Sequence, residues 1–217
     1  MPGTARPSRT DVQLVLVRHA LPERVDAPAE GSAVPADPGL TELGQRQAER
    51  LVPAIGPDVD ALYSSSMARA VATAEPLARA LGRPVAVLDS LREYDTEARH
   101  YVPVHEMARH DPQAWQRMLA GYLPGQVDTA AFAGRVGAAM EQIIAAHPGR
   151  ETAVVVAHAG VINIWLARLL ELARPLVFPL DYTGITRVLA GRDGRRVVRS
   201  VNETGHVADL LVMPTGG

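Results

Sequence analysis

The sequence predicts an α/β protein: a three-layer α/β/α sandwich around a mostly parallel central sheet. Two apolar, β-branched runs, Val12–Val17 (VQLVLV) and Thr152–Ala157 (TAVVVA), are typical of strands that are buried on both faces. Helical patterns alternate with strand-like runs along the chain, and strands joined through helices generally lie parallel. We expect one domain over residues 11–217, preceded by a disordered lead over residues 1–10.

The first strand is followed by a long loop and then by a helix. Residues 22–39 are rich in Pro, Gly and Asp, which is typical of a surface loop. Thr41 is the expected N-cap of a helix with an apolar face that runs to Ile55. Pro57 ends this helix.

The next elements are a short strand, a helix and another strand. The strand covers residues 61–63 and leads into three serines, residues 64–66, which we expect to cap the following helix. That helix covers residues 67–81 and stops at Gly82, and a strand over residues 85–88 comes next.

The C-terminal half completes the alternation. The periodicity predicts a long helix that ends before Pro148-Gly149, a helix directly after the second apolar strand, and a hairpin. These elements cover residues 129–147, residues 160–172, and residues 186–190 with 196–201.

The composition excludes several classes of function. Apolar residues make up 47% and charged residues 21% of the chain, with a formal net charge of −2, which is ordinary for a globular protein. The basic residues are dispersed, so we expect neither nucleic acid nor an anionic membrane as a partner. Cysteine is absent, which excludes disulfides and thiolate chemistry and suits a cytoplasmic location. The sequence does not determine the oligomeric state, and a homodimer is left open.

Histidines and arginines follow the strand ends at which such sheets bind ligands. The first strand runs into Arg18-His19, the strand over residues 152–157 runs into His158, and Arg69 stands in the first turn of a helix. Ligands of open α/β sheets bind outside the carboxyl ends of the strands, and helix N-termini favour anions. Two histidines and two arginines at one edge fit a tetrahedral oxyanion, because the guanidinium fork matches phosphate.

Five motifs in order resemble the histidine phosphatase superfamily, the phosphoglycerate mutase-like clan, in its small phosphatase branch. The resemblance covers most of the chain from Asp11 to about Leu210, except residues 96–135. Asn202 and His206 also resemble the Asn-x-x-x-His near the end of many members. The five motifs are Arg18-His19-Ala20, Leu40-Thr41-Glu42-Leu43-Gly44-Gln45-Arg46-Gln47-Ala48, Ser64-Ser65-Ser66-Met67-Ala68-Arg69-Ala70 with Thr73-Ala74, Leu91-Arg92-Glu93 and Val156-Ala157-His158-Ala159-Gly160-Val161-Ile162.

The resemblance implies a phosphomonoester hydrolase that needs neither metal nor cofactor and acts on a small phosphorylated metabolite. His19 would be the nucleophile that forms a phosphohistidine, held neutral with its remote nitrogen on a backbone carbonyl. Arg18, Arg69 and His158 would bind the phosphoryl oxygens. Glu93 would protonate the leaving group and then activate water, and its position could raise its pKa.

The chain departs from the family pattern at four places. Ala20 and Ala159 stand where glycine is usual, which is tolerable if φ stays negative. Val25-Asp26 replaces a polar residue that is frequent after the first motif, and Asn163 stands in place of an arginine. These changes affect the residues that support the site and leave the phosphate ligands in place.

The unmatched stretch, residues 96–135, is expected to form a helical lid over the site. Arg99, His100, Tyr101 and His105 are its candidate substrate contacts. The run His105-Glu106-Met107-Ala108-Arg109-His110 resembles a zinc-binding helix, but its second histidine is one position too late for both rings to share a face. No metal site is therefore expected.

Two other functions remain open. A phosphoglycerate mutase is disfavoured because Glu93-Tyr94-Asp95-Thr96-Glu97 is acidic where mutases of the clan carry a basic signature. A non-catalytic member that binds a phosphorylated ligand is disfavoured because both His19 and Glu93 are present. The sequence does not distinguish a phosphometabolite from a phosphoprotein as substrate.

Overall fold

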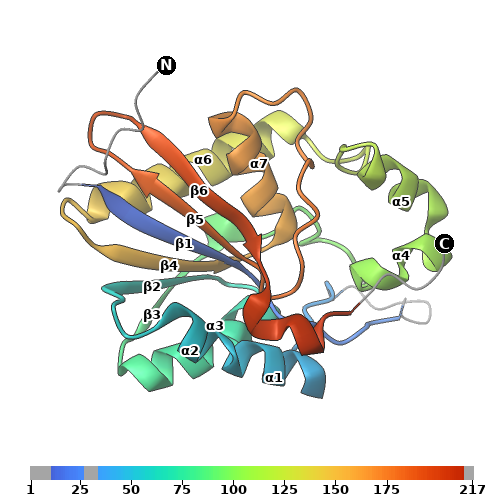
Figure 1. Cartoon of the computed structure of the whole chain (residues 1–217). Helices are drawn as coiled ribbons and strands as arrows, with labels where there is room; N and C mark the ends of the chain where they lie inside the picture. Colours follow the sequence, from blue (N-terminus) through green and yellow to red (C-terminus); the bar gives the residue numbers. More distant parts are fainter. Residues whose placement is uncertain (1–10, 27–33, 213–217) are drawn as a thin grey trace.

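The computed structural model describes residues 11–26 and 34–212. The lead expected over residues 1–10 lies outside the described residues. A six-stranded sheet with the order β3-β2-β4-β1-β5-β6 forms the centre of the molecule (Figure 1). Its strands are β1 (Val12–Arg18), β2 (Ala61–Ser65), β3 (Val85–Leu88), β4 (Thr152–Ala157), β5 (Ile185–Ala190) and β6 (Arg196–Glu203).

The sheet is mostly parallel, as predicted. β1, β4, β2 and β3 pair parallel to one another. β5 pairs antiparallel to both β1 and β6, so β6 has the same direction as β1 and only β5 of these six strands is reversed. β1 and β4 are the central pair, with Arg18 opposite Ala157 in register. The residues that follow these two strands therefore emerge side by side.

Helices cover both faces of the sheet (Figure 1). One face carries α1 (Glu42–Glu49), α2 (Leu51–Ile55) and α3 (Ala68–Leu81), and the other carries α6 (Thr129–Ala146) and α7 (Ala159–Leu169). Alternate residues of β1 pack into the two layers: Leu14 and Leu16 join the α6–α7 core, and Val15 and Val17 join the α2–α3 core. This two-sided burial explains the unbroken apolar run in the sequence.

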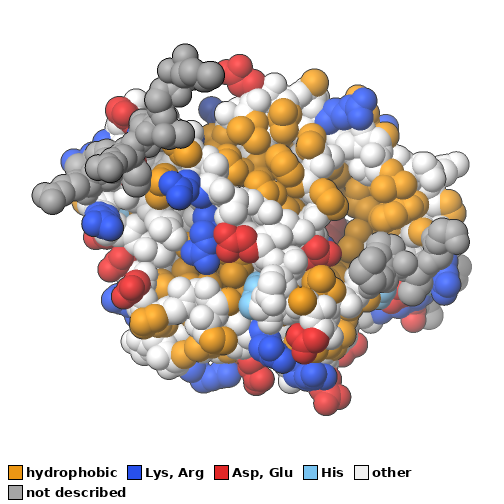
Figure 2. Space-filling view, in the orientation of Figure 1, with side chains coloured by type: hydrophobic (Ala, Val, Ile, Leu, Met, Phe, Trp, Pro, Cys, Tyr) orange, Lys and Arg blue, Asp and Glu red, His pale blue; other side chains and the backbone are white. Residues whose placement is uncertain are grey.

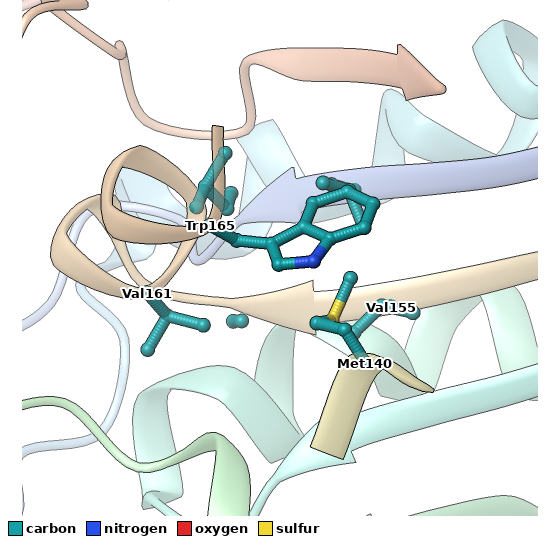
Figure 3. A pocket seen from close by; sticks show the side chains of 7 residues that line it. Met140, Val155, Val161 and Trp165 are labelled. Atoms are coloured by element: carbon teal, nitrogen blue, oxygen red, sulfur yellow. The ribbon is translucent and has the colours of Figure 1, made fainter. Parts of the chain in front are cut away.

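The α6–α7 core contains a small apolar cavity of about 10 Å³ (Figure 3). It is lined only by apolar side chains, among them Met140, Val155, Val161 and Trp165. A void of this size is no larger than one water molecule and has at most the Trp165 indole N–H as a polar partner, so we assign it to packing and not to a ligand.

Three details of the prediction were wrong. The helix expected from Thr41 to Pro57 is two helices that meet at Arg50, because Pro53 cannot donate to the carbonyl four residues earlier. Ser64 and Ser65 belong to β2, and α3 has Met67 as its N-cap without a side-chain hydrogen bond. The helix after β4 ends at Leu169 and not at residue 172. The caps at Thr41 and Gly82 are confirmed.

Residues 96–135 contain short helices and the start of α6. They lie beside the carboxyl end of the sheet, with α4 and α5 extending away from it (Figure 1). The remaining short elements are η1 (Asp89–Leu91), η2 (Val104–Glu106), α4 (Met107–His110), α5 (Pro112–Leu119) and η3 (Gly205–Leu210). Over the described ranges, no helix combines the length and the apolar character needed to cross a membrane. The face in Figure 2 carries acidic and basic side chains interspersed.

Candidate active site

His19 lies directly after β1 at the centre of the sheet. Its backbone N–H donates to the Ala157 carbonyl of β4 (2.8 Å), which holds the loop start against the neighbouring strand. Its ring Nδ1 lies 2.8 Å from the Ala20 carbonyl oxygen. A carbonyl only accepts, so Nδ1 carries the ring proton and Nε2 keeps its lone pair. The carbonyl contact expected from the sequence is thus present.

The imidazole of His19 is held in the neutral form. The side chain is buried, and burial lowers its pKa well below the ordinary 6.5, with Arg69, His158 and Arg18 lowering it further. A protonated ring would face two guanidinium groups in a site screened from water. A neutral imidazole with a free lone pair at Nε2 is a competent nucleophile.

Two buried arginines flank this ring with donors that have no protein partner. Arg18 donates from Nη1 to the Leu180 carbonyl (2.5 Å) and lies over the Tyr182 ring at 3.9 Å, but its Nε is unpaired. Arg69 is 1% exposed and donates from Nη2 to Asp95, while its Nε and Nη1 are unpaired. Buried donors without acceptors cost free energy, so such a set is expected where an anion binds.

His158 is the N-cap of α7 and follows β4 as His19 follows β1. The two ring centroids lie 5.2 Å apart. His158 Nε2 lies 2.8 Å from the Ser65 hydroxyl, and this oxygen already accepts from the Met67 N–H, so the Ser65 proton can go to Nε2. Nδ1, which has no protein partner, is then a donor. Burial and Arg69 lower the pKa of His158 well below its ordinary value.

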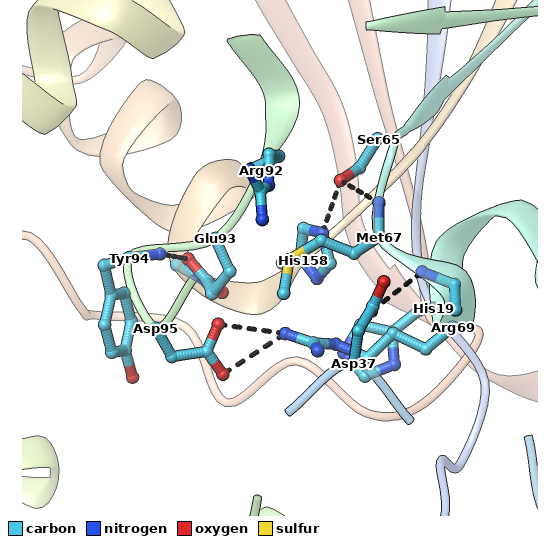
Figure 4. Close-up of polar contacts among 12 residues, drawn as sticks. His19, Asp37, Ser65, Met67, Arg69, Arg92, Glu93, Tyr94, Asp95 and His158 are labelled. Atoms are coloured by element: carbon cyan, nitrogen blue, oxygen red, sulfur yellow. Dashed lines mark hydrogen bonds and ion pairs between the residues drawn. The ribbon is translucent and has the colours of Figure 1, made fainter. Parts of the chain in front are cut away.

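Glu93 lies on the side of His158 that is opposite to His19 (Figure 4). Its Oε2 accepts from the Gly160 N–H at 2.8 Å, and its Oε1 accepts from the Tyr94 N–H at 3.2 Å. Burial, and after it the negative charge of Asp95, raises the pKa of Glu93 to about 7. A side chain at residue 160 would place its Cβ 2.3 Å from Oε1, so the close approach of Glu93 to the start of α7 requires glycine.

The structure therefore brings together all five side chains singled out from the sequence. Each is at most 7% exposed. They come from β1, α3, the segment after η1 and the β4–α7 junction, which meet at the carboxyl edge of the sheet (Figure 4). The five residues are Arg18, His19, Arg69, Glu93 and His158.

Residues beyond these five orient the group. Thr73 Oγ1 accepts from the Ala20 N–H (2.9 Å) and donates to the Arg69 carbonyl (2.6 Å), so α3 and the His19 loop are tied together. Tyr182 stacks on Arg18, and its ring centroid lies 5.8 Å from that of His19. Asn202 holds the loop that carries Tyr182 by accepting from the Asp181 N–H at 2.8 Å. Thr73 and Asn202 had a sequence signal, in the third motif of the resemblance and in the C-terminal motif, whereas Tyr182 had none.

The four departures have ordinary structural explanations. Neither Ala20 nor Ala159 has a positive φ, so the added methyl groups cause no backbone strain. Asn163 ties α7 to the loop at Phe178: its Oδ1 accepts from the Phe178 N–H (2.9 Å) and its Nδ2 donates to the Phe178 carbonyl (3.0 Å). Val25 exchanges backbone hydrogen bonds with Tyr101 of the predicted lid.

Of the four residues of the predicted lid that we expected to contact the substrate, two lie near the site and two lie on the surface. Tyr101 lies against the site, with Arg69 4.7 Å above its ring centroid. The His105 ring centroid lies 6.4 Å from that of Tyr182, whereas Arg99 and His100 are exposed. Glu106 and His110 pair with Arg24 on the surface. In residues 11–26 and 34–212, no group of three or more His, Cys, Asp or Glu side chains is arranged to hold a metal ion.

The site thus combines a buried neutral histidine, unpaired guanidinium donors and a carboxyl group with a raised pKa. The family model of the histidine phosphatase superfamily (branch 1) matches residues 14–204. The chain belongs to this superfamily.

Phosphatase structures share the fold. A phosphoserine phosphatase mutant from Entamoeba histolytica in complex with phosphoserine has a TM-score of 0.69 at 24% identity, with 90% of this chain and 99% of that chain covered. A mycobacterial glucosyl-3-phosphoglycerate phosphatase in complex with VO3 has a TM-score of 0.69 at 25% identity, with 88% and 98% covered.

Curated relatives from mycobacteria are longer than this chain. The bifunctional protein Rv2228c of Mycobacterium tuberculosis is 30% identical over 213 residues, which are 95% of this chain and 58% of the relative. An uncharacterized protein of Mycobacterium bovis matches to the same extent. The chain thus spans less than two thirds of the length of these relatives.

Proposed function

We propose that the chain is a metal-independent phosphomonoesterase that hydrolyses a small phosphorylated metabolite through a phosphohistidine on His19. The observation that carries this proposal is the buried, neutral His19 with its lone pair on Nε2, flanked by unpaired donors of Arg18 and Arg69. A phosphoryl group in this space would accept from those donors while Nε2 faces the phosphorus atom.

In the first step the lone pair of His19 Nε2 forms a bond to phosphorus, and the bond from phosphorus to the ester oxygen breaks. The ester oxygen takes the proton of Glu93 and leaves as an alcohol. Arg18 and Arg69 neutralise charge on the non-bridging oxygens, and the neutral His158 donates a hydrogen bond to them from its Nδ1–H. The two guanidinium groups supply the positive charge that a metal ion supplies in other phosphatases.

In the second step water attacks the phosphohistidine. Glu93, now a carboxylate, takes a proton from water as its oxygen bonds to phosphorus, and the bond from phosphorus to Nε2 breaks. Inorganic phosphate and neutral His19 are the products. A pKa of about 7 for Glu93 suits both steps near neutral pH, because the acid and base forms are then similarly populated.

We infer the size of the substrate from the side chains that enclose the site. Tyr101 and Tyr182 pack on the two arginines, and the catalytic side chains are almost fully buried. Such an enclosed site favours a small phosphoester over a folded phosphoprotein. Phosphoserine and glucosyl-3-phosphoglycerate, after which the similar phosphatases are named, are metabolites of this kind.

The test is hydrolysis of p-nitrophenyl phosphate in excess chelator by the wild type and by His19→Ala. We expect the wild type to stay active and His19→Ala to lose about 10³-fold or more, because no nucleophile remains. His110→Ala, which removes a surface histidine of α4, is the matched control and should keep full activity. Loss of wild-type activity on chelation, or an active His19→Ala, would refute the proposal.

A further inference from the structure

A carboxylate occupies part of the anion site. Arg69 Nη2 donates to both oxygens of Asp95, at 3.0 and 3.2 Å, while Nε and Nη1 of the same guanidinium stay unpaired (Figure 4). Arg69 is fully buried and the Asp95 side chain is 23% exposed. Asp95 thus holds the guanidinium through one nitrogen and leaves the other two for a ligand.

The negative charge of Asp95 next to Arg69 is expected to weaken the binding of a phosphoester. A phosphoester carries up to two negative charges, and a neighbouring carboxylate repels it. Binding alone would be better served by a neutral acceptor, such as a backbone carbonyl, which could orient Arg69 equally well. Asp95 is therefore expected to have a second effect on the site.

That second effect falls on Glu93, two residues earlier in the same segment. The pKa of Glu93 is raised first by burial and second by Asp95, whereas Arg69 lowers it. The charge of Asp95 thus offsets the effect of the arginine that the phosphate needs. Without Asp95, Arg69 would favour the carboxylate form of Glu93, and less of the protonated acid would be present at neutral pH.

We propose that Asp95 is a positioning residue of this enzyme, which aligns Arg69 toward the phosphoryl group and offsets the guanidinium charge beside Glu93. This inference rests on the proposed phosphatase reaction. Asp95 itself touches neither the reacting atoms nor the leaving group in this scheme. It acts through Arg69 and Glu93, so its removal changes the pH dependence and the affinity for anions in opposite senses.

The test is Asp95→Asn, which keeps an oxygen acceptor for Arg69 and removes the charge. For phenyl phosphate, a poor leaving group, we expect the alkaline limb of the kcat/KM profile to move to lower pH by about one unit. At pH 7.5 kcat then falls by up to about tenfold, since less Glu93 is protonated. Inhibition by inorganic phosphate becomes stronger by about threefold or more, because the repulsion is gone.

Three further variants make the test specific. Asp95→Glu keeps the charge and should keep the pH profile, and Glu97→Gln removes an exposed charge from the same segment and should change nothing. Asp95→Ser removes the same charge and must show the same acid shift if Asp95→Asn does not fold. Thermal melts of all variants show which are folded.

The outcomes separate this inference from the proposed function. If the wild type hydrolyses phenyl phosphate, His19→Ala does not, and Asp95→Asn matches the wild type in both pH profile and phosphate inhibition, Asp95 has no positioning role. A lower kcat without any pH shift indicates a purely structural role and also overturns the inference. If the wild type is inactive or His19→Ala is active, the proposed reaction itself fails.

Discussion

Replacing Glu93 with glutamine should lower kcat/KM for alkyl phosphates far more than kcat/KM for p-nitrophenyl phosphate. Glutamine has nearly the same shape, and its carbonyl oxygen can still accept from the Gly160 N–H, which lies 2.8 Å from Oε2 in the wild type. It carries no transferable proton. An alkoxide leaves only when it is protonated, whereas p-nitrophenolate is stable as an anion.

The size of the effect follows from the environment of Glu93. With a pKa of about 7, about half of the Glu93 side chains carry a proton at pH 7. At the ordinary value of 4.5 the protonated fraction would be about 0.3%, so the site raises it on the order of 150-fold. Loss of a general acid costs about 10²- to 10⁴-fold. We expect that loss in kcat/KM for an alkyl phosphate, against about tenfold or less for p-nitrophenyl phosphate.

The assay combines steady-state and rapid-mixing kinetics. In Glu93→Gln the water that attacks the phosphohistidine has no base, so dephosphorylation slows and the phosphoenzyme accumulates. With p-nitrophenyl phosphate a burst approaching one p-nitrophenol per active site should precede slow turnover. Equal losses for both substrates and no burst would show that another group is the acid, and an unchanged Glu97→Gln enzyme is the control for the loss of a nearby charge.

Two measurements test the packing around the same carboxyl. Because folding raises the pKa of Glu93, the protonated side chain contributes its full free energy to the folded state below about pH 4.5. This contribution is lost as the pH rises through about 7. Glu93→Gln should therefore gain stability relative to the wild type between pH 5 and 9, by up to about 3 kcal/mol in urea unfolding, and a difference that does not change with pH would contradict the burial of the charge. Gly160→Ala places a methyl group 2.3 Å from Glu93 Oε1, so alkyl phosphate hydrolysis should fall by about tenfold or more. Gly134→Ala in α6 meets nothing within 4 Å, so its activity should match the wild type and its stability should rise by up to about 1 kcal/mol; equal activities of the two alanine variants would refute the argument.

Local patterns in the sequence were sufficient for the strands and for the residues at their ends. Short runs rich in β-branched residues predicted β1 and β4, and these strands are adjacent and parallel, so His19 and His158 meet at one edge. Prediction failed where two local signals conflict. The apolar face of the helix after Thr41 continues past Arg50, but Pro53 interrupts the backbone hydrogen bonds and the helix breaks there.

The sequence by itself determined the α/β class with its two central strands, the order of the motifs and the identity of the five side chains that gather at the carboxyl edge of the sheet. Only the tertiary structure decided how these groups are tuned. Arg18 is oriented by Leu180, 162 positions away, and Ser65 faces His158 across 93 positions. Asp95, which is near Glu93 in sequence, becomes important only because folding places Arg69 against it. Protonation depends on burial and on charges brought close in space, and no periodicity or spacing in a sequence records either of them.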